Sequence, residues 1–181
     1  MTERSDAERM KLAAEGAETA FAELVEKYQN VLLNFFLRKG VSFADGQDLA
    51  QRTFLRLWRY RERYSPQAKF TTFLFLLAGQ VAVDFFRAES RRQGLEEGYE
   101  RELETRTAVR NGEASAGASP GEDVRRAVAR LSPALRDVVE LAVFQDLPYA
   151  DVAEILSIPE GTVKSRMFNA LKKLKELMNE R

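Results

Sequence analysis

The stretch from Gln93 to Gly121 nearly lacks large apolar side chains, and this limits how the whole chain can fold. It is rich in Glu, Arg, Gly, Ser and Ala, and from Asn111 onward it has too little apolar surface to offset the entropy of ordering the backbone. One hydrophobic core cannot extend across such a stretch. The sequence therefore predicts two small domains, residues 1–92 and 122–181, joined by a flexible linker of residues 93–121, whose first part, Leu95 to Val109, can hold a loose helix.

Apolar residues on both sides of this linker recur at helical spacing, and no segment shows a strand signal. Before the linker, the pattern predicts helices over 6–15, 17–38, 45–60 and 70–92. The last of these is apolar nearly all round, which is typical of the central helix of a bundle. After the linker, short helices are predicted up to Leu131 and again from Pro133, because proline is favoured in a first helical turn. The fold class is all-α, with two small helical bundles.

The segment from Tyr149 to Leu177 contains two helical patterns separated by a break at Ser157 to Pro159. In the second pattern, one face is predicted to be buried and consists of Val163, Met167, Ala170, Leu171, Leu174 and Leu177. The opposite face carries Thr162, Ser165, Arg166, Asn169, Lys172 and Lys173. Short hydrogen-bonding groups together with cations suit a helix that reads base edges and binds phosphates, so we predict a helix-turn-helix. The alternative is an ordinary surface helix whose lysines face water.

The composition excludes several classes of function. The formal net charge is zero, so DNA contacts must come from local patches, and the chain has neither cysteine nor histidine. This removes disulfides, thiolate or imidazole metal sites, cysteine nucleophiles and imidazole bases, and no carboxylate pair stands out. Carboxylate chemistry remains possible, but we expect no metal and no cofactor. The N-terminus lacks an apolar signal core, and polar residues interrupt the run from Phe70 to Phe86, so we expect a cytoplasmic protein without membrane insertion.

The polar loop from Arg59 to Lys69 mixes arginines with Tyr60 and Tyr64. Aromatic rings stack on unpaired bases and cations follow phosphates, so the loop suits single-stranded nucleic acid. The alternative, and for a loop considered alone the more common case, is a solvated turn whose tyrosines pack inward.

Together these segments resemble the extracytoplasmic-function (ECF) sigma factors of bacterial RNA polymerase. The N-terminal half is similar to their region 2 over Ala20–Leu24 with Tyr28, Asp48–Arg59, Phe70–Leu74 and Asp84–Arg87. The C-terminal half is similar to their region 4 over Leu131–Pro133, Arg136–Leu141 and Tyr149–Leu174, including Gly161–Arg166. The order of both motifs, on either side of a linker in a short chain, is what makes the resemblance specific.

The resemblance implies a non-enzymatic factor that binds core RNA polymerase and directs promoter-specific transcription initiation. It implies core polymerase contacts by Asp48, Gln51, Arg52, Leu55 and Trp58, although Trp58 can equally belong to the core. It implies that the −10 promoter element is recognised and melted by Tyr64, Lys69, Phe70, Thr72, Phe73, Gln80 and Arg87. It implies that the −35 element is read by Thr162, Lys164, Ser165, Arg166, Asn169 and Lys173, with Lys164 placed to reach a flanking phosphate. An anti-sigma factor that covers the polymerase-binding faces is a further implied partner.

The sequence departs from the family pattern at the −10 region. Many members have Trp where this chain has Phe73, and Arg-Asn where it has Gly79 and Gln80. Gly79 removes a cation and costs up to about 1 kcal/mol inside a helix. Two other functions fit parts of the sequence: a helix-turn-helix regulator that acts without core polymerase, and a sigma-like adaptor that binds only protein partners.

Overall fold

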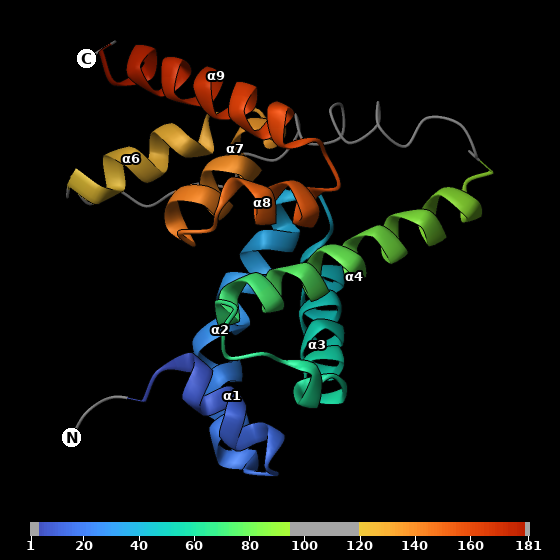
Figure 1. Cartoon of the computed structure of the whole chain (residues 1–181). Helices are drawn as coiled ribbons and strands as arrows, with labels where there is room; N and C mark the ends of the chain where they lie inside the picture. The colour runs from blue at the N-terminus through green and yellow to red at the C-terminus, as the bar shows by residue number, and fades with distance from the viewer. Residues whose placement is uncertain (1–3, 95–119, 180–181) are drawn as a thin grey trace. The chain divides into compact units, whose positions relative to one another are not determined.

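The computed structural model describes residues 4–94 and 120–179, and every regular element within these ranges is helical (Figure 1). The helices fall into two compact units, one containing α1 to α4 and the other α6 to α9. The all-α prediction is confirmed. Residues 95–119, which make up most of the predicted linker and contain the loose helix predicted for Leu95 to Val109, lie outside the described residues.

The N-terminal unit contains α1 (Asp6–Ala14), α2 (Glu18–Arg38), α3 (Phe43–Arg59) and α4 (Phe70–Arg92), with a short 3-10 turn η1 (Arg61–Arg63) between α3 and α4. Serine caps begin two of these helices, because a hydroxyl can accept a hydrogen bond from a free N–H of the first turn. Ser5 Oγ accepts from the Glu8 amide at 3.2 Å and Ser42 Oγ accepts from the Asp45 amide at 3.1 Å. Glycines with positive φ, Gly16 and Gly40, follow α1 and α2, where a left-handed residue ends a helix.

The core of the N-terminal unit is built from the apolar positions that recur at helical spacing. Its members that are at most 1% exposed include Leu24, Leu32, Phe35, Phe36, Leu49, Leu57, Leu74 and Phe75. Phe35 packs edge-on against Phe75, with the ring centroids 5.3 Å apart, which joins α2 to α4. Burying each such side chain contributes about 1.5–3 kcal/mol, so these contacts hold the helices together.

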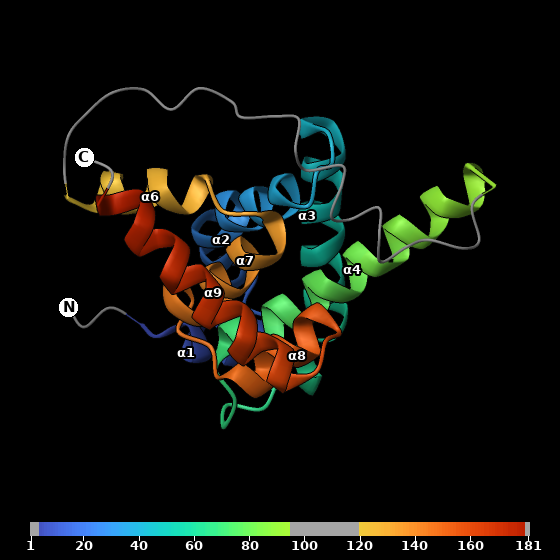
Figure 2. The ribbon, with the colours of Figure 1, turned by 90° about the horizontal axis from the view of Figure 1, so that it is seen from above.

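Helix α4 is the central helix of this unit in its first half only. Its buried residues all lie between Phe70 and Ala82. Beyond Ala82 no residue of the helix is buried, and its C-terminal end extends past α3 (Figures 1 and 2). By length and composition it is the one helix within 4–94 and 120–179 that could cross a membrane, but the core helix of a globular protein passes the same test.

The C-terminal unit contains α6 (Pro120–Ala129), α7 (Pro133–Val139), a π-helical turn η3 (Glu140–Phe144), α8 (Tyr149–Leu156) and α9 (Glu160–Asn179). Pro133 lies in the first turn of α7, as predicted. Ser157 ends α8 in the left-handed conformation, with φ 55°. Ile158 and Pro159 then lead directly into α9, which packs on both α7 and α8 (Figure 2). Helices α8 and α9 therefore form the predicted helix-turn-helix.

The core of the C-terminal unit is apolar and lies between α7, α8 and α9. Its fully buried members include Val138, Leu141, Val152, Val163 and Ala170. The prediction was wrong for Leu171, whose side chain is 56% exposed. At 100° per residue, Leu171 points about 75° away from the middle of the buried stripe of α9, which leaves its side chain largely in solvent. Leu171 lies instead beside the 70% exposed Phe168.

Candidate functional site

The outer face of α9 carries the residues predicted to read the −35 element. Lys164, Ser165, Asn169 and Lys173 are exposed, while Thr162 and Arg166 are half-buried. The buried residues Val163, Met167 and Ala170 alternate with them and fix the helix against α7 and α8. The structure thus brings these predicted residues together on one exposed helix, although Lys164 lies toward its edge, as the helical spacing predicts.

Two of the five cations on α9, Lys164 and Lys173, have an acidic partner on the same helix. Lys164 Nζ pairs with Glu160 Oε1 at 2.8 Å, one turn earlier, and this contact raises the pKa of Lys164. Lys173 Nζ lies 3.3 Å from Glu176 Oε2, and Ser165 Oγ donates to the Thr162 carbonyl at 3.1 Å. Arg166 makes no hydrogen bond or ion pair with any residue that the structure describes. Its guanidinium can therefore bind an acceptor without breaking an internal contact.

The residues predicted to contact core polymerase lie on α3, and most of them face solvent. Asp48, Gln51, Arg52 and Leu55 are exposed, with Leu55 65% exposed. Asp48 and Arg52 form an i,i+4 ion pair of 2.8 Å. Such a surface, with an apolar side chain among an acid, an amide and a cation, suits contact with another helix.

Trp58, the last residue of that predicted set, is half-buried. Its ring packs against Phe21 of α2 with centroids 4.9 Å apart, and the Arg61 guanidinium lies 4.2 Å from the ring centroid. Trp58 thus belongs in part to the core, which is the alternative that the sequence leaves open. A polymerase contact by its exposed edge stays a prediction.

The residues predicted to act on the −10 element separate into two groups. Lys69, Gln80 and Arg87 are exposed and Phe73 is half-buried. Phe73, Gln80 and Arg87 are spaced by seven residues, so they follow one side of α4 over about 21 Å. In contrast, Tyr64, Phe70 and Thr72 are buried, at 9%, 4% and 8% exposure.

Two members of the buried group, Tyr64 and Phe70, form an aromatic cluster with the buried Tyr28 and the half-buried Phe73; the aromatic cluster is defined here as these four residues. Phe70 lies 5.3 Å from the Tyr28 ring and 6.2 Å from the Tyr64 ring, and Tyr64 lies 5.6 Å from Phe73, all between centroids. The Tyr64 hydroxyl donates to the Ala68 carbonyl at 2.9 Å, which closes the loop before α4. Burial raises the pKa of Tyr64, so this hydroxyl stays protonated and can donate. In this structure Tyr64 packs inward, and its contact with DNA stays a prediction.

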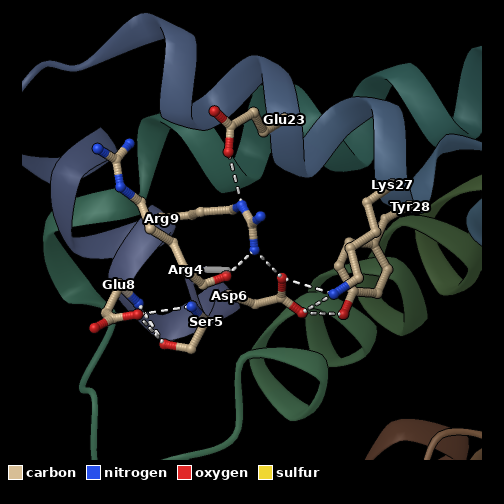
Figure 3. A network of polar contacts seen from close by, with 8 residues as sticks. All are labelled: Arg4, Ser5, Asp6, Glu8, Arg9, Glu23, Lys27 and Tyr28. Carbon is tan, nitrogen blue, oxygen red and sulfur yellow. Dashed lines mark hydrogen bonds and ion pairs between the residues drawn. The ribbon is translucent and has the colours of Figure 1, made fainter. Parts of the chain in front are cut away.

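Sequence reasoning missed a polar network between α1 and α2 (Figure 3). The Asp6 carboxylate accepts from the Tyr28 hydroxyl at 2.5 Å and from Lys27 Nζ at 2.8 Å. Arg9 Nε pairs with Glu23 Oε2 at 2.8 Å on the same pair of helices. In the sequence, Asp6 is only an acid in a first helical turn, and nothing local indicates that it meets Tyr28. Within the described residues no group of acidic side chains could hold a metal ion.

Comparison with models of protein families matches residues 24–92 to Sigma-70 region 2 and residues 121–174 to Sigma-70, region 4. The chain is 29% identical over 177 residues to the ECF RNA polymerase sigma-E factor of Haemophilus influenzae, covering 94% of this chain and 92% of that protein. It is 27% identical over 177 residues to the RNA polymerase sigma-H factor of Pseudomonas aeruginosa, with the same coverage. The matches therefore include both helical units in their order along the chain.

Two solved structures share the fold. The sigma factor RpoE of Bartonella quintana, in complex with the anti-sigma factor NepR, superposes with a TM-score of 0.62 at 21% identity, covering 88% of this chain and 96% of that one. CnrH, in complex with the cytosolic domain of CnrY, superposes with a TM-score of 0.56 at 19% identity, covering 97% of both chains.

Proposed function

Because this chain belongs to the extracytoplasmic-function sigma factors, which bind core RNA polymerase and direct promoter-specific transcription initiation, we propose that its two units divide this task. Residues 1–92 act as region 2, which binds the polymerase and opens the −10 element, and residues 122–181 act as region 4, which reads the −35 element, with residues 93–121 as the tether. The observation that carries this division is the pair of family matches, to region 2 and then to region 4, in a chain that matches whole relatives.

In the C-terminal unit, α9 enters the major groove of the upstream duplex. Arg166 is the residue best suited to bind a guanine edge or a phosphate, because its guanidinium is unpaired within the described chain. Thr162, Ser165 and Asn169 are short enough to bond base edges beside it. Lys164 and Lys173 contact the flanking phosphates, where their exposed ammonium groups add affinity without sequence preference.

In the N-terminal unit, the exposed face of α3 docks on a helical surface of the polymerase through Asp48, Gln51, Arg52 and Leu55, with the exposed edge of Trp58 at its end. The exposed side of α4 then faces the opened −10 strand. Phe73 supplies a partly exposed ring for stacking, while Lys69, Gln80 and Arg87 supply cations and an amide along the backbone. The buried Tyr64, Phe70 and Thr72 act from beneath, as the support of this surface.

We further propose that an anti-sigma factor covers the polymerase-binding face of α3 when the factor is inactive. Two structures of the same fold support this: RpoE was solved with the anti-sigma factor NepR, and CnrH was solved with the cytosolic domain of CnrY. The chain has no cysteine or histidine with which to sense redox state through thiols or to hold a zinc site, so its activating signal arrives through a partner or through its own abundance. It works in the cytoplasm, beside the polymerase, and catalyses no reaction itself.

Reconstituted transcription tests the proposal. Core polymerase, with or without the purified chain, is given promoter fragments that differ only in their −10 and −35 elements. We expect transcripts of defined length only when the chain is present and only from matching promoters. Tight, sequence-specific DNA binding by the chain alone, without transcripts, would instead support a regulator that acts without polymerase. Core binding without transcripts from any promoter would support a protein-binding adaptor.

The division between the units is tested by a double substitution on α3. We expect Asp48→Ala with Gln51→Ala to weaken core polymerase binding about tenfold, which corresponds to 1.4 kcal/mol, because both side chains stand on the docking face. Competition against a labelled sigma factor measures this. The matched control is Gln29→Ala with Asn30→Ala, two exposed polar residues of α2 outside every proposed surface. Equal loss in both doubles would contradict the assignment of α3.

A further inference from the structure

We infer that Asp6 is a positioning residue for promoter opening, which acts through Tyr28 on the aromatic cluster beneath the −10 surface. The inference rests on the proposed function, because it concerns the surface of Phe73 and the loop of residues 64–69. Asp6 lies outside the region 2 match, which begins at residue 24, so the family comparison assigns it no role.

The contacts form a continuous path from Asp6 to the −10 surface, and Figure 3 shows its first step, from Asp6 to Tyr28. The Asp6 carboxylate accepts a hydrogen bond of 2.5 Å from the Tyr28 hydroxyl. The Tyr28 ring packs on Phe70, the first residue of α4, with the ring centroids 5.3 Å apart. Phe70 packs against Tyr64, and Tyr64 packs against Phe73. The Tyr64 hydroxyl also donates a hydrogen bond to the Ala68 carbonyl. Each step joins a buried or half-buried ring to the next, so the orientation of Tyr28 restricts Phe73 and the loop.

The hydrogen bond from Tyr28 to Asp6 is strong enough to matter. Its acceptor is a carboxylate that is mostly buried, with 16% of its side chain exposed, and Lys27 and Arg9 lie within ion-pair distance. A hydrogen bond to a carboxylate is roughly twice as strong as a bond between two neutral groups. Burial and this contact raise the pKa of Tyr28, so the hydroxyl remains a donor throughout the physiological range.

An opened strand binds best to a −10 surface whose side chains are already held in place. Bases that have left the duplex stack on aromatic rings, and a surface that is already ordered pays less entropy when it receives them. Helix α1, which carries Asp6, contacts both η1 and α4, the two elements on either side of the loop of residues 64–69. The Arg9–Glu23 pair also joins α1 to α2, and Glu23 is one contact further from the aromatic cluster than Asp6, because Arg9 lies between Glu23 and Asp6.

That second pair supplies a matched control. Tyr28→Phe keeps the ring and removes only its bond to Asp6, whereas Glu23→Gln removes an ion pair from the same helix interface and leaves the cluster intact. In the full chain, we expect amide hydrogen exchange of residues 61–76 to become about fivefold to tenfold faster in Tyr28→Phe. In Glu23→Gln it should stay within about twofold of the wild type.

Promoter opening provides the functional readout. With core polymerase and duplex promoter, we expect permanganate-reactive open complex to fall about fivefold in Tyr28→Phe and to recover to within about twofold on a template already unpaired at −10. Affinity for core polymerase should not change. Asp6→Asn should reproduce the defect. These results together support a positioning role, since general loosening of the unit would also weaken core binding and would not be rescued.

Three outcomes would overturn the inference. The first is that Tyr28→Phe opens the promoter as well as the wild type does. The second is that Glu23→Gln loses as much promoter opening as Tyr28→Phe. The third is a loss of core affinity as large as the loss of opening. If the wild-type chain itself opened no promoter, the proposed function would fail and the inference with it, so the two failures are distinguished by the wild-type reaction.

Discussion

The two regions predicted to contact DNA are built differently. On α9, the predicted residues are exposed or half-buried on a helix whose other face is packed into the core. In the region from Tyr64 to Phe73, most of the predicted residues are buried, and only Lys69 and Phe73 reach the surface. A duplex already presents its base edges in a groove, so a rigid helix with exposed polar groups is sufficient to read it. An unpaired strand has no fixed shape, so the surface that receives it must be held in place from behind.

This contrast predicts that the Tyr64–Phe73 region uses the same residues for folding stability and for DNA contact. On α9, it predicts that different residues serve these two purposes. The largest effect should follow from Phe70→Ala, because Phe70 is 4% exposed and packs between two tyrosine rings. We expect the free energy of unfolding of the N-terminal unit to fall by about 3–5 kcal/mol. Trp58 is the single tryptophan of the chain and lies in this unit, so its fluorescence in urea reports the change.

Phe43→Ala is the control for that substitution. Phe43 belongs to the same unit but is 59% exposed, so its loss should change the free energy of unfolding by no more than about 0.5 kcal/mol. If Phe70→Ala cost as little as Phe43→Ala, the aromatic cluster would not be the support of this region and the contrast with α9 would disappear.

Arg166→Ala should have the opposite profile. We expect promoter-specific initiation to fall about tenfold to a hundredfold, which corresponds to the loss of one good base or phosphate contact, while stability and core binding stay unchanged. Initiation on promoters with and without the −35 element measures this. Arg125→Ala removes an exposed cation from α6 of the same unit and should leave initiation unaltered. Equal loss from a promoter that lacks the −35 element would contradict the assigned role.

The difference between the regions also explains how far the sequence could be interpreted. The outer face of α9 was predictable because the sides of a helix follow from 100° spacing alone, and the burial of Val163, Met167 and Ala170 agrees with it. Leu171 was not predictable in this way. Its exposure depends on which flank of α9 the neighbouring helices cover, and spacing within one helix carries no information about that.

Loop residues and long-range pairs were beyond the reach of sequence patterns for the same reason. The sequence leaves open whether Tyr64 faces solvent or the core, and the structure buries it against Phe70 and Phe73. Asp6 and Tyr28 belong to different helices, and their bond follows from the packing of α1 on α2 (Figure 3). A resemblance to a family indicates which segments matter, but the side chains that support them become visible only in the folded unit.

A smaller effect should follow from Tyr64→Phe, which separates support by packing from support by hydrogen bonding. The ring stays and the bond to the Ala68 carbonyl is lost, so we expect a loss of about 0.5–1.5 kcal/mol in unfolding free energy. Hydrogen exchange in the loop of residues 64–69 should rise correspondingly. Tyr60→Phe is the control, because Tyr60 lies just before this loop and its ring packs under Arg63. Equal effects in both variants would show that the hydroxyl of Tyr64 has no special part.

The smallest effect on stability should follow from Lys164→Gln, which tests whether the cations of α9 are available to DNA. Its pair with Glu160 is exposed at both partners, so losing it should cost no more than about 0.5 kcal/mol. If Lys164 binds a phosphate, the salt dependence of promoter binding by the holoenzyme should weaken by about one in slope. Glu160→Gln breaks the same pair but keeps the cation, so it should lose the same stability and keep the wild-type slope. An equal fall in the salt-dependence slope of both variants would mean that Lys164 acts through its ion pair with Glu160 and not through a phosphate. In that case α9 would depend on internal contacts in the same way as the Tyr64–Phe73 region.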